Sequence, residues 1–255
     1  MQIVIPMSGL GARFSSAGYK DIKPLIKVHG KPIIEWVVDL FPGEHNFIFI
    51  CREEHLKQTP LRKELERIKP ESKIIPIEGH KKGPVYAVSK VFNLIDDESP
   101  VITNYCDFFM KWDYNHFKAI VGQTNCEGAI PCYTGFHPHL LHEKNLYAGC
   151  RTDEVNNLIE IKEKYSFTGD KTQGQHSTGT YYFKSGKILK NYFEELMSKD
   201  INLQGEYYIS LVYNLLVRDH LKVITYTDIP HFCQWGTPED LQEYSYWAKI
   251  FKKAI

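Results

Sequence analysis

The first half of the chain alternates between short apolar runs and longer stretches with helical spacing. In chain order these segments are residues 2–7, 31–41, 46–51, 61–68, 73–77, 85–95 and 100–105, beginning with a strand-like run. The strand-like runs carry apolar residues on both faces, which is typical of strands that are covered by helices on both sides. The alternation therefore predicts an α/β fold built on a mainly parallel sheet with right-handed connections.

The pattern changes from Glu127 onward. Strand-like segments separated by turn residues follow at residues 127–136, 145–152, 155–164 and 177–183. They predict further strands, some of them antiparallel, in a smaller β-rich lobe. Helices are expected at 184–197 and 206–217, a strand at 222–227, and a last helix from Pro238 to about Lys253 with Gly236 and Thr237 as its cap.

The charge balance limits the partners of the chain. Its 255 residues contain 31 basic and 31 acidic side chains, so no overall field attracts nucleic acid or an anionic membrane. No signal peptide or membrane-spanning run is present in the sequence, and the six cysteines form no C-x-x-C pair. We expect a cytoplasmic protein with small-molecule partners, free thiols, no nucleic acid and no membrane; a homodimer is compatible with this.

The stretch IPMSGLGARF, residues 5–14, places two glycines between a strand and a helix. Such a turn exposes backbone N–H groups that suit a phosphate. A dinucleotide fingerprint requires a third glycine where Phe14 stands, and a P-loop requires Gly-Lys-Ser/Thr where the chain has Ala12 and Arg13. What remains is an anion loop over which Arg13 and Lys23 can converge on a polyphosphate.

Residues 5–37, IPMSGLGARF followed by GYKDIKPLIKVHGKPIIEWV, resemble the N-terminal signature of the nucleoside-triphosphate transferase family. That signature is G-x-G-x-R followed by K-P, and the family includes sugar-phosphate nucleotidylyltransferases and cytidylyltransferases. Further elements resemble the family in the expected order: VITNYCDFF, IEIKEKY, STGTYYF, GEYYIS and GTPEDL. The chain is also similar to small capsule-biosynthesis members, the CTP:phosphoglutamine cytidylyltransferases.

The resemblance implies a nucleotide-diphospho-sugar transferase fold, with a Rossmann-like central sheet, flanking helices and a smaller acceptor lobe. It implies one nucleotidyltransferase domain over residues 1–255, with a nucleotide-binding half at 1–125 and an acceptor-binding half at 126–255. No further catalytic domain is expected, so the chain would be an enzyme with a single function.

The reaction implied by the resemblance moves a nucleoside monophosphate from a triphosphate to a phosphorylated acceptor and releases pyrophosphate. Both reactants are anions, so catalysis needs cations, positioning and a metal ion, which is Mg²⁺ in this family. Arg13 and Lys23 would be the catalytic cations. The residues implied for nucleotide binding are Met7, Ser8, Gly9, Leu10, Gly11, Ala12, Arg13, Lys23, Lys82, Gly83 and Asp107.

Asp107 follows an apolar strand, where ligands bind in open α/β sheets, and is the implied Mg²⁺ ligand. Gln234 stands where relatives carry a second acid, so Asp107 acts with the triphosphate and water alone, or Glu206 or Asp228 substitutes. The acceptor would contact Glu163, Lys164, Gly179 and Glu206.

Other functions remain open. CTP is favoured as the donor, with thymidylyl or uridylyl transfer to a sugar 1-phosphate as alternatives, and a role in capsule or cell-surface polysaccharide biosynthesis is expected. Sugar, amino-acid amide and choline-like phosphates all fit as acceptors. A glycosyltransferase of similar fold and a non-catalytic nucleotide binder are weaker alternatives, because Tyr105 replaces the first acid of an Asp-x-Asp motif while Lys23 and Asp107 are present.

Overall fold

Strand β1 (Gln2–Met7) sends its side chains into two separate hydrophobic cores. Ile3 and Ile5 pack with apolar residues of α2 (Ile33–Val38), whereas Val4 packs with those of α8 (Ile209–Arg218). Each core lies against one face of the central sheet. The prediction that both faces of the central strands are covered by helices is therefore confirmed.

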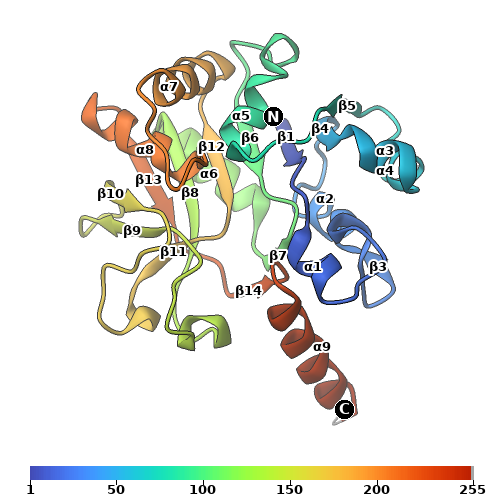
Figure 1. The fold of residues 1–255 in the computed structure, drawn as a ribbon. Coiled ribbons are helices and arrows are strands. Elements are labelled where there is room, and N and C mark those ends of the chain that lie inside the picture. Colours follow the sequence, from blue (N-terminus) through green and yellow to red (C-terminus); the bar gives the residue numbers. More distant parts are fainter. Residues whose placement is uncertain (254–255) are drawn as a thin grey trace.

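The computed structural model describes residues 1–253, and in this range one sheet has ten strands (Figure 1). Their order is β10-β9-β11-β8-β12-β6-β1-β4-β5, and β13 pairs with β8. The remaining strands span β4 Asn46–Arg52, β5 Lys73–Ile77, β6 Val101–Asn104, β8 Gly128–Tyr133, β9 Gly149–Thr152, β10 Leu158–Lys162, β11 Gln175–Ser177, β12 Thr180–Phe183 and β13 Val223–Tyr226.

The direction of each strand follows from its pairing. β5, β4, β1 and β6 are parallel neighbours, and β13 is parallel to β8. β12 is antiparallel to both β6 and β8, so β8 runs in the same direction as β6. The edge strands β11, β9 and β10 alternate in direction beyond β8. The sheet is therefore mainly parallel, as the sequence predicts.

Helices cover both faces of this sheet. The helices not yet given span α1 Ala12–Ser16, α3 Glu53–Gln58, α4 Leu61–Ile68, α5 Gly83–Ser89, α6 Tyr114–Thr124, α7 Gly186–Ser198 and α9 Pro238–Lys253. Short 3₁₀ turns lie at η1 Lys23–Leu25, η2 Phe92–Leu94, η3 Pro138–Leu141 and η4 Lys171–Gln173, and a small hairpin joins β2 Lys27–Val28 to β3 Lys31–Pro32. None of the helices in residues 1–253 has the length and apolar character needed to cross a bilayer.

The last helix agrees with its prediction. α9 spans Pro238–Lys253 and extends away from the rest of the molecule (Figure 1). Thr237 Oγ1 accepts a hydrogen bond from the Asp240 backbone N–H and donates one to Asp240 Oδ2, at 3.2 and 2.7 Å. This reciprocal pair caps the helix and fixes where it begins.

Three features differ from the sequence analysis. The helix expected at 85–95 ends at Ser89 and continues as the turn η2. α3 and α6 were not predicted. A separate pair of strands, β7 (Phe108–Lys111) and β14 (His231–Gln234), joins segments more than 100 residues apart, so no local pattern could indicate their pairing.

The antiparallel direction of β12 brings its first residues to the carboxyl edge of β6. The Tyr105 N–H donates to the Gly179 carbonyl at 3.0 Å, and the Thr180 hydroxyl donates to the Asn104 side-chain oxygen. Thr180 and Asn104 are fully buried. This polar pair fixes the register of β12 beside the edge where the parallel strands end.

We predict that Thr180→Val lowers the free energy of unfolding by about 1–3 kcal/mol, because it leaves the buried Asn104 oxygen without its donor. Urea unfolding measures this difference. Thr180→Ser keeps the hydroxyl and is expected to lose less. Equal stabilities of the Val and Ser variants would contradict the assigned role of this hydrogen bond.

Candidate functional site

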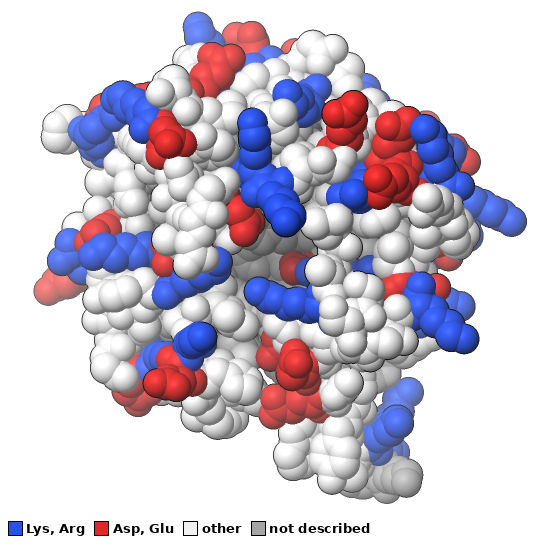
Figure 2. Space-filling view, in the orientation of Figure 1, with Lys and Arg blue, Asp and Glu red and all other residues white. Residues whose placement is uncertain are grey.

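Two cavities meet at the carboxyl edge of the parallel strands. The first has a volume of about 510 Å³ and the second about 300 Å³. Figure 2 shows a hollow near the middle of this face of the molecule, with Lys and Arg side chains around its rim. The two cavities share one wall, which consists of Lys23, Tyr105, Asp107, Glu206 and Tyr208.

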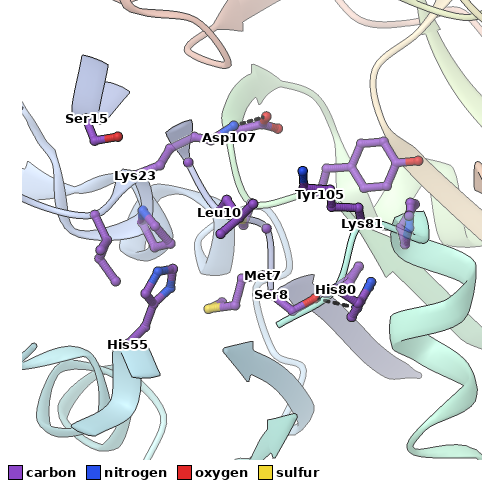
Figure 3. A pocket seen from close by; sticks show the side chains of 18 of the residues that line it. Met7, Ser8, Leu10, Ser15, Lys23, His55, His80, Lys81, Tyr105 and Asp107 are labelled. Atoms are coloured by element: carbon purple, nitrogen blue, oxygen red, sulfur yellow. Dashed lines mark hydrogen bonds and ion pairs between the residues drawn. The ribbon is translucent and has the colours of Figure 1, made fainter. Parts of the chain in front are cut away.

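The first cavity is lined by the loop after β1, by the segment from α1 to η1, and by the turn before α5 (Figure 3). Gly11 has φ +64°, a left-handed conformation that glycine adopts without strain, and it directly precedes α1. Of the residues predicted to bind nucleotide, those that line this cavity are Met7, Ser8, Gly9, Leu10, Gly11, Lys23, Gly83 and Asp107.

Three predicted nucleotide residues lie elsewhere. Arg13 lines the second cavity and not the first, because it points from α1 toward that side. Ala12 lines neither cavity. Lys82 also lines neither; its ammonium lies 4.8 Å from the centre of the Tyr86 ring, and Lys81 occupies the cavity wall in its place.

Lys23 and Asp107 form the central contact of the shared wall. Lys23 Nζ lies 2.7 Å from Asp107 Oδ2 and 3.5 Å from the Gly236 carbonyl (Figure 3). Lys23 begins η1, where the buried residues Pro24 and Leu25 hold the backbone in place. Asp107 lies just beyond the end of β6. The structure thus brings together two residues that the sequence analysis assigns to one site.

The charge of Lys23 is stabilised where it lies. Burial lowers the pKa of the ammonium, but the Asp107 carboxylate outweighs that effect, so the pKa is raised overall. The side chains of Lys23 and Asp107 are 22% and 27% exposed, so both remain open to the cavities. A fixed positive charge therefore faces both cavities at the same point.

The C-terminal part of the chain closes on Asp107 from the other side. β14 pairs with β7 in a register that sets Gln234 opposite Phe108, and the Trp235 N–H donates to the Asp107 carbonyl at 3.1 Å. A Cβ on Gly236 would come within 3.1 Å of Asp107 Oδ2. Glycine at this position lets the backbone approach the carboxylate closely.

The second cavity contains the residues predicted for the acceptor. Glu163 and Lys164 follow β10, and Gly179 precedes β12. Lys164 Nζ donates to the Tyr208 hydroxyl at 3.0 Å, and Gly179 has φ +96°. A Cβ at Gly179 would contact the Tyr105 ring at 3.0 Å, so a larger residue would crowd the shared wall.

Glu163 is a carboxyl group in an unfavourable environment for charge. Burial raises its pKa to about 7, although the Ser210 hydroxyl donates to Glu163 Oε2 at 2.5 Å and Lys164 lies nearby. The group therefore changes charge near neutral pH, beside a lysine that could hold an anion.

The residues around Asp107 fit a magnesium ion of the kind that is shared with a substrate. Mg²⁺ is usually held by one or two carboxylates together with substrate phosphates and water. Asp107 and the Gln234 amide line the second cavity together and offer oxygen ligands. Within residues 1–253, no group of three or more His, Cys, Asp or Glu side chains forms a complete metal cage.

The two acids considered as substitutes for a second ligand lie in different places. Glu206 belongs to the wall shared by both cavities. Asp228 lines neither cavity; its carboxylate lies 3.5 Å from His116 of α6. The suggestion that Asp228 substitutes is therefore wrong, because the strand that precedes it carries it to a different part of the molecule.

The structure adds residues that sequence reasoning did not select. Tyr105 and Tyr208 belong to the shared wall, and His55 and His80 line the first cavity. Among the described residues the buried Tyr105 hydroxyl has no hydrogen-bond partner. A signal for His80 existed in the sequence, since it lies in the turn EGHKKGP directly before the Gly83–Pro84 helix start.

Comparisons with known proteins agree on the fold. No protein-family model matches the chain. The bifunctional protein GlmU of Thermosipho africanus is 23% identical over 236 residues; the match covers 90% of this chain but only 46% of the length of that protein.

Solved structures match over nearly the whole chain. The nucleoside-diphosphate-sugar pyrophosphorylase from Vibrio cholerae has a TM-score of 0.77 at 19% identity and covers 96% of this chain and 100% of its own. A candidate glucose-1-phosphate thymidylyltransferase from Bacillus anthracis, solved with sucrose, has a TM-score of 0.74 at 15% identity, covering 97% and 95%. HddC from Yersinia pseudotuberculosis has a TM-score of 0.61 at 20% identity, covering 96% and 99%. These likenesses confirm the α/β fold with its mainly parallel sheet and flanking helices.

The raised pKa of Glu163 predicts how the free energy of unfolding changes with pH. Because its pKa is raised from 4.5 to about 7 by folding, the native state holds a proton that the unfolded state releases, and stability falls as the pH rises through this range. Between pH 5 and 8, wild type should lose up to about 3 kcal/mol more than Glu163→Gln. Urea unfolding at both pH values measures this, with the exposed Glu194→Gln as a control that should behave like wild type. Parallel pH profiles of wild type and Glu163→Gln would contradict the assignment.

Proposed function

We propose that this protein is a nucleotidylyltransferase. It moves a nucleoside monophosphate from a nucleoside triphosphate to a small phosphorylated acceptor and releases pyrophosphate. The observation that carries the proposal is the Lys23–Asp107 pair in the wall shared by two cavities. One cavity has a glycine loop suited to a triphosphate, and the other has cationic side chains suited to a second phosphate.

The two cavities divide the binding work. Backbone N–H groups of the loop at residues 8–11 hold the triphosphate in the first cavity. Arg13 and Lys164 line the second cavity and attract the acceptor phosphate. The reacting groups would then meet beside Lys23, the one cation among the described residues of the shared wall.

The chemistry requires no covalent intermediate. An acceptor phosphate oxygen attacks the α-phosphorus in line, and the bond from that phosphorus to the pyrophosphate oxygen breaks. Negative charge on the transferring group increases at this stage, and Lys23 stabilises it through a charge that is already in position. Positioning of two anions that repel each other supplies much of the remaining acceleration.

Asp107 and the Gln234 amide would hold Mg²⁺ together with oxygens of the triphosphate. When bound, the ion neutralises phosphoryl charge and orients the triphosphate. In the structure the Lys23 ammonium donates a hydrogen bond to Asp107 Oδ2, the oxygen that Mg²⁺ would need. We therefore expect the ammonium to shift toward the phosphate when nucleotide and metal are bound. Through Asp107, the position of the Lys23 side chain would depend on whether the nucleoside triphosphate is bound.

We propose CTP as the donor substrate and a role in capsule or cell-surface polysaccharide biosynthesis. Both proposals rest on the sequence resemblance. Transfer from UTP or dTTP to a sugar 1-phosphate fits the two cavities as well. A panel of CTP, UTP, dTTP, ATP and GTP with glucose 1-phosphate, phosphocholine and phosphorylated glutamine, read by pyrophosphate release, tests the function. Release with one pair supports it, and a protein that instead cleaves a nucleotide-sugar without pyrophosphate release would be a glycosyltransferase.

We predict that Lys23→Ala folds normally and loses about 10²–10³-fold in kcat/KM, because it removes the charge that faces the reacting phosphates. Pyrophosphate release measures the loss, and circular dichroism checks the fold. The exposed neighbour Lys27→Ala serves as the control and should keep its activity. A folded Lys23→Ala protein with near wild-type kcat/KM would refute the role of Lys23.

We also predict that Asp107→Asn is inactive at the Mg²⁺ concentration that is optimal for wild type, because a neutral amide is a weaker ligand than a carboxylate. Gln234→Asp, which adds an acid to the same cavity, should keep activity and reach its optimum at lower Mg²⁺. Titration of Mg²⁺ against pyrophosphate release compares the three proteins. Full activity of Asp107→Asn, or of wild type in excess chelator, would show that the metal site is wrongly assigned.

A further inference from the structure

A histidine connects two of the segments that line the first cavity. His80 Nε2 lies 3.1 Å from Ser8 Oγ in the glycine loop, and His80 Nδ1 lies 3.2 Å from the backbone N of Lys82 (Figure 3). Ser8 and His80 both line the cavity, and Ser8 is almost completely buried. The contact spans 72 residues of sequence and belongs to no strand pairing or helix.

The direction of these hydrogen bonds follows from the donors available. The Lys82 N–H can only donate, so His80 Nδ1 must accept. A neutral imidazole then carries its proton on Nε2 and donates it to Ser8 Oγ. Ser8 Oγ is thereby an acceptor toward His80, and its own hydrogen is left free to be donated elsewhere.

The surroundings favour this neutral form of His80. Burial lowers the pKa of the ring, and the cations Lys90, Lys82 and Arg52 lower it further. The Tyr86 ring packs edge-on against the imidazole with a centroid distance of 4.8 Å and restricts its rotation.

The backbone that orients His80 is itself held firmly. The Lys82 carbonyl accepts from the Tyr207 N–H at 3.0 Å, and the Val85 N–H donates to the Tyr207 carbonyl at 3.1 Å. Gly83 between them has φ +80°, and a Cβ there would come within 2.8 Å of the Tyr207 backbone. The position of the Lys82 N–H is therefore fixed by tertiary contacts and not by the flexible turn alone.

We propose that the Ser8 hydroxyl is a donor to the nucleotide in the first cavity and that His80 is the positioning residue that aims it. Ser8 lines the cavity, and with His80 as its donor the hydroxyl can turn its hydrogen toward an acceptor oxygen or ring nitrogen of the bound nucleotide. This inference rests on the proposed function, because it requires the first cavity to bind a nucleoside triphosphate.

The test measures dissociation constants by calorimetry for CTP with Mg²⁺, and in parallel for UTP, dTTP, ATP and GTP. We expect Ser8→Ala and His80→Asn each to weaken binding by about tenfold, the usual loss when a hydrogen bond to a charged or buried partner is removed. The double variant should be no weaker than Ser8→Ala within about twofold, because both changes remove the same contact. His80→Gln, whose longer amide can still donate to Ser8, should bind more tightly than His80→Asn.

Two distant substitutions serve as matched controls. Ser198→Ala at the end of α7 and His116→Asn on α6 remove the same groups outside the cavity and should leave binding unchanged. Melting temperatures without nucleotide separate positioning from general damage, since the Ser8 and His80 variants should melt close to wild type.

The outcomes are distinguishable. Wild type that binds none of CTP, UTP, dTTP, ATP and GTP would overturn the proposed function and this inference with it. Wild type that binds, together with Ser8→Ala or His80→Asn variants of unchanged affinity, would overturn the inference alone. Additive losses in the double variant, or equal affinities of His80→Asn and His80→Gln, would show that His80 does not act through Ser8.

Discussion

The ion pair between Lys23 and Asp107 joins three parts of the chain that fold around the site. Lys23 comes from the turn after the glycine loop, Asp107 from the end of β6, and the Gly236 carbonyl that also approaches Lys23 comes from the segment before α9. Both charged side chains are partly exposed, so water screens their attraction and the pair adds little to the stability of the fold. Its importance lies in its position, because a cation and a carboxylate at this point face two cavities at once.

Much of the architecture could be predicted from local patterns. The alternation of Ile3, Val4 and Ile5 between two cores follows directly from strand geometry, and it required a sheet covered on both faces. The beginning of α9 was likewise visible, since Thr237 can cap only the turn that follows it. Patterns of this kind depend on residues that are close in sequence, so they can be recognised from the sequence alone.

The remaining features depend on contacts between distant segments. Pairing of β7 with β14 brings Gln234 beside Asp107, whereas Asp228, only six residues earlier, lies against α6. In the turn before α5, Lys81 and not Lys82 lines the first cavity, and Arg13 of α1 lines the second cavity and not the first. Sequence spacing narrows such a choice to a few neighbours, and only packing decides which of them faces a cavity.

The antiparallel strand in the middle of the sheet has a consequence for how the protein is made. During synthesis from the N-terminus, β1, β4, β5 and β6 can assemble early, but the open side of β6 finds its partner only when residues 180–183 have left the ribosome. β8 pairs with β12 along one edge, and along its other edge it gains β13 only near residue 223. Non-local pairing of this kind slows folding and leaves a hydrophobic strand edge unpaired in the nascent chain. The strands in the middle of the sheet thus gain their last partners late in synthesis. Until then the exposed edge of β6 in the incomplete chain is open to aggregation.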